Sequence, residues 1–285
     1  MTVSIRPISM DDAEACGVIC YEAFRTIAEA HNFPPDFPSP DAGVGLMRMM
    51  IAHPRMYGVA AEADGRVIGS NFLWEQSSIA GVGPITIDPR AQNAGVGRAL
   101  MQAVIERADG QGWAGVRLVQ AAYHGRSLSL YTRLGFDPRE PLAVLQGPAI
   151  GQPVPGCAVR PATDADAQAC DALCRAVHGH DREGEVRDAI AQGSARVVER
   201  GGRLTGYATS IGFFGHAAGE TNDDMKALIA ETAGFAGPGL LMPMRNAELF
   251  RWCLEAGLRV VQPMTLMSRG PYQEPKGAFL PSILF

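Results

Sequence analysis

The sequence predicts an α/β protein built from two tandem domains, and three observations support this prediction. The chain has 285 residues, which is the length of about two ordinary domains. Segments typical of strands and of helices alternate along each half. Finally, the second half repeats segments of the first half in the same order.

The repeat is clearest at the start of each half. Residues 3–20 and 157–174 share an Arg-Pro pair, an aspartate, two alanines and two cysteines at a constant offset. Two further blocks follow with drifting offsets: residues 57–72 with 195–209, and residues 127–145 with 249–267. A tandem duplication with insertions and deletions explains this pattern, and chance similarity between two domains of one class is the alternative. The Gly/Pro-rich stretch 147–156 predicts the boundary, which gives domains 1–148 and 157–285.

The first half is expected to begin with a short strand at 3–6 and a helix at 11–28. Ser9 and Asp12 predict where this helix begins, because a hydroxyl caps free amide groups and a carboxylate is favoured at the positive helix end. A second helix is expected at 41–52.

The rest of the first half follows the same alternation. Residues 57–74 have the pattern of two strands joined by a Gly-containing turn, and the apolar residues between 100 and 108 share one face of a helix. Residues 115–121 have the apolar character of a buried central strand. The predicted elements are, in order, strands 57–62, 66–74 and 82–87, helix 96–109, strand 115–121, helix 126–134 and strand 140–146.

Composition and charge argue against several classes of function. The net charge is −5 and no basic stripe is visible, so no nucleic-acid partner is expected. No apolar run approaches the roughly 20 residues that span a bilayer, and the first residues lack the layout of a signal peptide. The six cysteines are scattered without metal-ligand spacing, so we expect no metal and free thiols in a cytoplasmic protein.

Two glycines, Gly95 and Gly97, lie between a predicted strand and a predicted helix. Glycines at such a junction let an anion approach the amide groups of the helix start, which suits a phosphate or pyrophosphate. Leu100 stands where a dinucleotide-binding fingerprint has its third glycine, and no Gly-Lys-Ser/Thr follows as in a Walker loop. A tight turn without a ligand is the alternative.

Two motifs at this separation resemble the GNAT superfamily of acyl-CoA-dependent N-acyltransferases. They are the Gln-x-x-Gly-x-Gly loop, residues 92–97, and the Leu-Tyr-x-x-x-Gly-Phe element, residues 130–136. The strand–helix–helix–strand–strand order of residues 3–74 fits the same family. The resemblance implies two GNAT-like domains, each a mixed, mostly antiparallel twisted sheet flanked by helices, with acetyl-CoA as the co-substrate.

The resemblance also implies roles for individual residues. The loop amides would hold the pyrophosphate of coenzyme A, and the strand at 84–87 would pair with its pantetheine arm. Tyr131 would protonate the departing thiolate as general acid, and an aromatic ring packed under the sheet is the alternative reading. The expected coenzyme-binding residues are Ile85, Thr86, Ile87, Gln92, Asn93, Ala94, Gly95, Val96, Gly97, Arg98, Ala99 and Ser127.

The sequence departs from the family pattern at one position of the site. His124 stands seven residues before Tyr131, where many family members have Asn. It could bind the pantetheine or relay a proton, and an ordinary surface histidine is the alternative. Glu75, at the end of a predicted strand, is the candidate general base, although a neighbouring carboxylate or a base acting through water is equally consistent.

The second half lacks the glycine loop. Its equivalent turn carries Glu220, Asp223 and Asp224, which would repel a pyrophosphate, and Cys253 replaces the tyrosine. Asn222 or Asp223 is the expected helix cap. We therefore expect one active site per chain, in the first domain.

Polar clusters kept in the second half suggest an acceptor role for it. We expect His178, His216 and Glu220 to bind the substrate, and the alternative is cap and turn chemistry together with an inter-domain hydrogen-bond network. An acidic pocket at the domain interface would then select a small cationic amine. The mostly apolar last five residues, 281–285, predict that the tail docks on the protein.

These observations predict an N-acetyltransferase that transfers an acetyl group from acetyl-CoA to a primary amine of a small molecule. Alternatives are a non-catalytic acyl-CoA sensor or scaffold, an O-acyltransferase, and a protein-lysine acetyltransferase. The expected oligomeric state is a monomer or homodimer.

Overall fold

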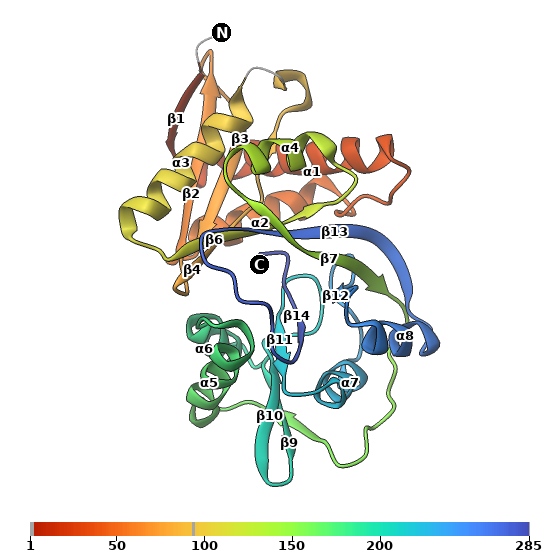
Figure 1. Ribbon diagram of the computed structural model, residues 1–285. Helices are drawn as coiled ribbons and strands as arrows, with labels where there is room; N and C mark the ends of the chain where they lie inside the picture. Colours follow the sequence, from red (N-terminus) through yellow and green to blue (C-terminus); the bar gives the residue numbers. More distant parts are fainter. Residues whose placement is uncertain (1–2, 93–94, 285) are drawn as a thin grey trace.

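The computed structural model describes residues 3–92 and 95–284, and it places the two halves of the chain one above the other (Figure 1). The first half contains a helical layer on each face of a long sheet. Its elements are β1 (Val3–Pro7), a 3₁₀ turn (Met10–Asp12), α1 (Ala13–Ala30), α2 (Pro40–Ala52), β2 (Met56–Ala63), β3 (Arg66–Trp74), β4 (Ile79–Val82), β5 (Thr86–Ile87), a 3₁₀ turn (Pro89–Ala91), α3 (Val96–Gln111), β6 (Gly115–Ala121), α4 (Gly125–Arg133) and β7 (Asp137–Gln146).

The second half contains a similar order of elements, and most of its strands and helices are shorter than their counterparts. Residues 147–157 connect the halves and lie outside helices and strands. The elements are β8 (Ala158–Pro161), a 3₁₀ turn (Asp164–Asp166), α5 (Ala167–His178), α6 (Glu183–Ala191), β9 (Arg196–Arg200), β10 (Arg203–Ala208), β11 (Ala217–Gly219), α7 (Asn222–Glu231), β12 (Leu240–Pro243), α8 (Ala247–Glu255), β13 (Arg259–Arg269) and β14 (Ala278–Leu280).

The two halves share a sheet by exchanging strands. The long sheet has the order β1-β2-β3-β4-β6-β13-β7-β12, with β5 on β3, and the second sheet has the order β14-β11-β10-β9-β8. In the sequence repeat, β7 corresponds to β13 and β6 corresponds to β12. The order β6-β13-β7-β12 is therefore symmetric with respect to the two halves. Each half thus inserts its long strand between two strands of the other half. Among the described strands, β4 and β6 form the single parallel pair, which confirms the mostly antiparallel prediction.

Strand β13 has a partner strand on each edge over its second half, from Met264 to Ser268. It pairs antiparallel with β6 from Met264 opposite Ala121 to Arg269 opposite Val116. Its other edge pairs antiparallel with β7 over a longer span, from Arg259 opposite Gln146 to Ser268 opposite Asp137. The sequence predicts two domains but not this exchange, because pairing partners far apart in the chain leave no local pattern.

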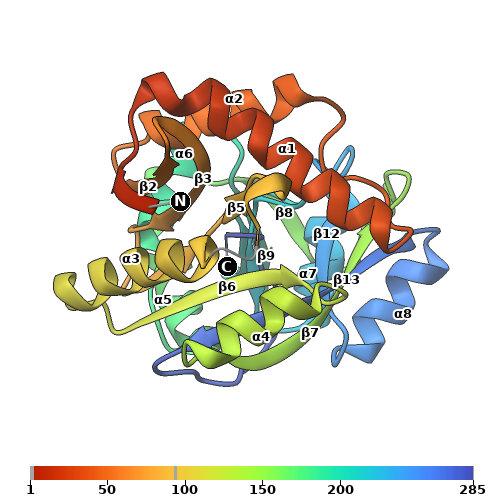
Figure 2. The same cartoon turned by 90° about the horizontal axis from the view of Figure 1, so that it is seen from above.

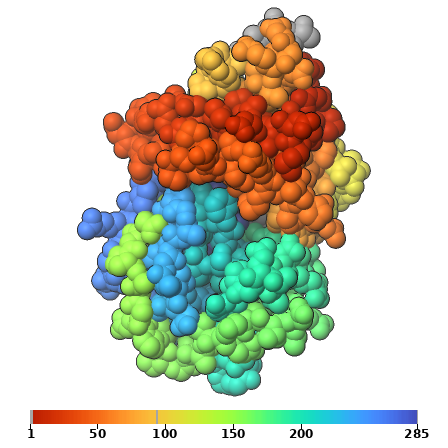
Figure 3. All heavy atoms as spheres, turned by 180° about the vertical axis from the view of Figure 1, so that it is seen from behind, coloured from red at the N-terminus to blue at the C-terminus, as the bar shows by residue number. Residues whose placement is uncertain are grey.

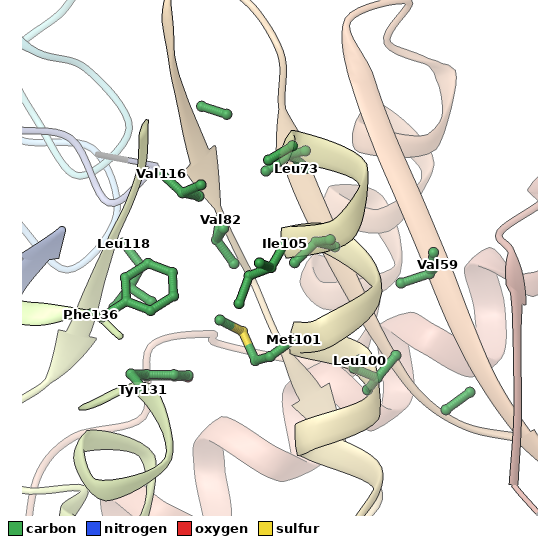
Figure 4. Packing of buried hydrophobic residues seen from close by; sticks show 14 of the residues in the cluster. Val59, Leu73, Val82, Leu100, Met101, Ile105, Val116, Leu118, Tyr131 and Phe136 are labelled. Carbon is green, nitrogen blue, oxygen red and sulfur yellow. The ribbon is translucent and has the colours of Figure 1, made fainter. Parts of the chain in front are cut away.

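The core of the first half lies between the sheet and α3 with α4 (Figure 4). Leu100, Met101 and Val104 are fully buried on one face of α3, as the spacing of apolar residues predicts. Each such side chain contributes roughly 1.5–3 kcal/mol through the hydrophobic effect. Helices α1 and α2 cover the opposite face, and seen from behind they lie directly on the second half (Figure 3).

Two neighbouring strands of the long sheet, β4 and β6, separate part of the way along their length. The predicted strand at 82–87 is in fact two short strands, because Gly83 adopts a φ of +133° and Pro84 has no N–H for a ladder. Strands β4 and β6 pair only up to Gly81 opposite Arg117. Beyond that point β5 pairs with β3 while β6 continues beside β13, so the strands diverge.

Candidate active site

A cavity of about 890 Å³ lies where β4 and β6 diverge. This volume is within the range of small-molecule sites in proteins. One end is lined by β5 and by the N-termini of α3 and α4, and the other by α1, α2 and parts of the second half. In the view from above, α3 with α4 and α1 with α2 lie on opposite sides of the strands that border it (Figure 2).

The first turn of α3 offers amide groups to an anion. Gly95 caps the helix with a φ of +78°, which favours glycine. The first intrahelical bond runs from the Ala99 N–H to the Gly95 oxygen (3.1 Å), so the amides of Val96, Gly97 and Arg98 remain without helical acceptors. A Cβ on Gly97 would lie 3.0 Å from the Ile87 Cδ1.

The coenzyme-binding residues expected from the sequence therefore gather at one end of the cavity, with three exceptions. Asn93 and Ala94 lie outside the described residues. Ala99 does not line the cavity, and its amide is used inside the helix.

Strand β5 presents amide groups to the opening. The Asp88 N–H donates to the Ile68 oxygen of β3 (2.8 Å). Because N–H groups alternate along a strand, those of Ile85 and Ile87 point away from β3, toward β6. The opposing β6 edge is unpaired with β4 beyond Arg117. An extended ligand could therefore bond with both edges.

Three arginines line the same end of the cavity: Arg98, Arg126 and Arg133. Arg126 also donates a hydrogen bond to the Gln92 side-chain oxygen, which links the start of α4 to the glycine loop. Positive charge beside a helix N-terminus favours phosphate groups.

Tyr131 lines the cavity from α4 and is 5% exposed. Its ring meets Phe136 edge to face at 6.3 Å between centroids (Figure 4). Burial raises the pKa of the Tyr131 hydroxyl to about 12, against a smaller lowering by a hydrogen bond with Ser127. The hydroxyl therefore carries its proton at neutral pH and can donate it.

Ser127 lies about one turn before Tyr131 on α4, and His124 is the N-cap of this helix, about one turn before Ser127. The Ser127 hydroxyl is 2.8 Å from the His124 Nδ1, and both residues line the cavity. Burial, followed by the charge of Arg126, lowers the pKa of His124 to about 4. The imidazole is thus neutral at neutral pH and acts as a hydrogen-bonding group, not as a cation.

The opposite end of the cavity is mostly apolar and contains one carboxylate. Among the described lining residues Asp36, in the loop between α1 and α2, is the single acidic side chain. Its Oδ1 accepts a hydrogen bond from the Gln262 Nε2 (2.8 Å), and the Gln262 Oε1 accepts one from the Tyr123 hydroxyl (3.1 Å). The sequence analysis missed Asp36, because it lies in a Pro-rich stretch with no periodic pattern.

The predicted general base is elsewhere. Glu75 does not line the cavity, and both of its carboxylate oxygens accept hydrogen bonds from Arg107 (2.9 and 3.1 Å). Arg107 thus occupies both oxygens, and Glu75 is not placed to take a proton from a group in the cavity.

The three predicted acceptor-binding residues also lie outside the cavity. His178 borders a separate space of about 10 Å³, which is the size of one water molecule. The His216 Nε2 lies 2.9 Å from the Tyr207 hydroxyl, and the ring is buried. Glu220 pairs with Arg203 at the surface. These three residues therefore do not line the cavity, and they do not form the expected acidic pocket there.

The acidic turn of the second half is a helix cap. Asp224, not Asn222 or Asp223, closes a capping box, with Thr221 as the N-cap. Its carboxylate is fully buried and accepts bonds from the Thr221 amide (2.9 Å) and the Thr205 hydroxyl (2.6 Å). The N-terminus of α7 thus contains its own anion where α3 leaves its amides open.

The C-terminal segment reaches the cavity, as the apolar tail predicts. Ile283 and Leu284 line the cavity, and the Ile283 N–H donates to the Phe213 oxygen (2.8 Å). A Cβ on Gly81 would lie 2.1 Å from the Leu284 carbonyl oxygen, so the tail passes directly over β4. The second half therefore closes the cavity with apolar groups.

Other expectations from the sequence concern metals, thiols and membranes. In residues 3–92 and 95–284, no group of three or more His, Cys, Asp or Glu is placed to hold a metal ion. All six cysteines are free thiols. None of the helices in this same part of the chain is both long and apolar enough to cross a bilayer.

Comparisons with known proteins agree with this architecture. Residues 23–136 match the family model of the acetyltransferase (GNAT) family. A candidate acetyltransferase from Pyrococcus horikoshii is 14% identical, with a TM-score of 0.73 over 97% of this chain and 91% of that chain. A GCN5-related N-acetyltransferase from Sphaerobacter thermophilus is 16% identical, with a TM-score of 0.59 over 97% and 98%. No curated protein sequence matches the chain.

Proposed function

Because residues 23–136 match the family model of the acetyltransferase (GNAT) family, we propose that this chain transfers an acetyl group from acetyl-CoA to a primary amine of a small molecule. One observation carries the proposal: a continuous cavity joins the open amides at the start of α3 to an apolar chamber, through the gap between β4 and β6. The anion-binding end suits the donor, and the chamber suits the acceptor.

The donor end fits coenzyme A group by group. The amides of Val96, Gly97 and Arg98 would bind the pyrophosphate, and the absence of side chains at Gly95 and Gly97 lets it approach the backbone. The pantetheine arm would extend between β5 and β6 as an added strand. The amides of Ile85 and Ile87 are directed to that space, so one of them can stabilise negative charge on the thioester oxygen.

Transfer then follows from the groups at the gap. The amine nitrogen attacks the thioester carbon, a C–N bond forms and the C–S bond breaks. The leaving sulfur takes the proton of the Tyr131 hydroxyl, which burial keeps protonated. Ser127 and the neutral His124 form a hydrogen-bonded chain from that hydroxyl, through which the proton can be replaced. Holding both reactants in one cavity supplies much of the rate.

The second half favours a small acceptor over a protein lysine. Phe213, Phe214, Ile283 and Leu284 close the end of the cavity opposite the coenzyme loop. A lysine on a protein surface would have to displace these side chains to reach the thioester.

The experiment is an amine panel with acetyl-CoA, in which free thiol is measured with a chromogenic disulfide and products are weighed by mass spectrometry. We expect thiol release that depends on a primary amine, and a product heavier by one acetyl group on nitrogen. Tight acetyl-CoA binding without turnover on any amine, or acetylation of alcohols alone, would refute the proposal.

A further inference from the structure

The acceptor end of the cavity combines an apolar wall with a single carboxylate. The apolar side chains of this wall come from α1, α2, the loop between them and the second half. They include Phe24, Phe37, Met50, Phe213, Phe214 and Leu284. Asp36 is the one charged side chain in this wall among the described residues.

Asp36 has no cationic partner in the described part of the chain. The hydrogen bond that its carboxylate accepts comes from the neutral amide of Gln262, and no arginine, lysine or histidine charge acts on it. Burial raises the pKa of the Asp36 carboxyl, and the bond from Gln262 opposes this in part. A carboxylate in apolar surroundings without a countercharge is costly, unless a ligand supplies the charge.

Both halves of the chain hold this carboxylate in place. Gln262 is 1% exposed and belongs to β13, at the end where β13 passes the last residue of β6. Tyr123 lies just after β6, and its ring stacks on Phe33 at 4.3 Å, which fixes the loop that carries Asp36. The carboxylate is therefore a positioned group at the C-terminal end of β6, on the border of the gap.

We propose that the acceptor is a primary amine on a hydrophobic body, such as an arylalkyl or alkyl monoamine, and that Asp36 binds its ammonium group. This inference rests on the proposed function and adds the class of substrate. The aromatic and aliphatic wall buries the body of the ligand, and the carboxylate pairs with its single charge. A second charge on the ligand would enter the apolar wall without a partner, so diamines and amino acids are disfavoured.

The assignment also accounts for the protons of the reaction. An ammonium nitrogen loses two protons on becoming an amide. Asp36 takes the first and makes the amine a nucleophile, then passes it to solvent. The second leaves the nitrogen after attack and balances the proton that Tyr131 gives to sulfur.

The test compares three acceptors with wild-type protein and two variants. The acceptors are 2-phenylethylamine, its alcohol analogue 2-phenylethanol and the polar 1,4-diaminobutane. Asp36→Asn keeps the shape and removes the charge, and Asp41→Asn is the matched control, because Asp41 lies exposed at the start of α2 and outside the cavity. Calorimetry measures binding of each acceptor and of acetyl-CoA, and thiol release measures kcat/KM.

We expect 2-phenylethylamine to exceed the diamine at least tenfold in kcat/KM, and 2-phenylethanol to release no thiol. Asp36→Asn should lower both binding and kcat/KM of the amine about 10- to 100-fold, the loss expected for a charged hydrogen bond, and leave acetyl-CoA binding unchanged. Asp41→Asn should change neither. A preference for the diamine, or equal amine binding and turnover in Asp36→Asn and wild type, would overturn the inference.

The design separates failure of the inference from failure of the proposed function. Phenylethylamine that binds through Asp36 but is never acetylated would refute acetyl transfer and support the binding role. Amine acetylation that is indifferent to Asp36→Asn would refute the role of Asp36 and leave the transferase intact. Failure of every hydrophobic amine to bind would overturn the inference.

Discussion

The substitution Tyr131→Phe separates a general acid from an aromatic ring that only packs. The change removes one hydroxyl and keeps the ring in its edge-to-face contact with Phe136. Its cost in stability should stay near ~1 kcal/mol, the typical contribution of one hydrogen bond, here the bond with Ser127. The folded protein can therefore be assayed at the same temperature as wild type.

The expected loss in activity is much larger than the loss in stability. A positioned general acid contributes about 10²- to 10⁴-fold to a rate. We expect kcat to fall at least 100-fold, which is about 2.7 kcal/mol of activation free energy. Binding of acetyl-CoA should stay within twofold, because the amides of α3 and β5 are unchanged. Single-turnover acetyl transfer and calorimetry with acetyl-CoA measure the two quantities.

The pH dependence provides a second check on the same residue. Burial raises the pKa of Tyr131 to about 12, so the acid form persists across the accessible alkaline range. The wild-type kcat should therefore not decline between pH 8 and 10 through loss of this proton. Unchanged kcat in Tyr131→Phe, or a wild-type alkaline limb near pH 9 that this variant abolishes, would refute the reasoning.

Three further predictions address the coenzyme site, stability and the strand exchange. Gly97→Val should weaken acetyl-CoA binding at least tenfold by calorimetry, since its Cβ would lie 3.0 Å from the Ile87 Cδ1 and cover the open amides; Gly110→Val, in open space near the other end of α3, should leave it unchanged. Hydrogen bonds from Arg6 lower the pKa of Asp12 to about 2. The stabilisation of the folded state by this pair is therefore present above pH 4 and lost as pH falls toward 2. Asp12→Asn should cost about 1 kcal/mol in urea unfolding at pH 7, discounted for the exposed arginine, and nearly nothing at pH 2. A fragment 1–148 should aggregate and fail to bind acetyl-CoA, because it lacks β13 between β6 and β7; a monomeric, binding-competent fragment would contradict this.

Local patterns in the sequence predict most of the elements but not how the halves join. The helix at 96–109 and the strand at 115–121 agree with α3 and β6 because their signals lie within a few turns of chain. The exchange of β7 and β13 depends on contacts between strands far apart in the sequence. The apolar residues of a strand do not indicate which other strand it pairs with. Gly83 and Pro84, which interrupt the predicted strand at 82–87, are visible in the sequence. The gap that opens between β4 and β6 at this point is seen only in the structure.

The same distinction applies to the site. The glycine loop and Tyr131 are detectable because a helix start and a motif need particular residues at fixed spacing. Glu75 shows where local patterns fail. Its place at the end of a predicted strand was consistent with a general base, but it pairs with Arg107, 32 residues away, and does not line the cavity. Asp36 could not be selected in advance, since its hydrogen-bond partner Gln262 lies on β13, 226 residues further along the chain.

The two halves make different contributions to the cavity. The first half keeps open amides at the start of α3, whereas Asp224 fills the equivalent helix start in the second half. The second half provides β13, whose Gln262 side chain donates a hydrogen bond to Asp36. It also provides the apolar segment ending in Leu284, which lines the cavity. Removal of the second half would therefore take away both the partner of Asp36 and part of the cavity wall. The second half, whose helix start is filled by Asp224, thus contributes to the cavity through the wall that it forms.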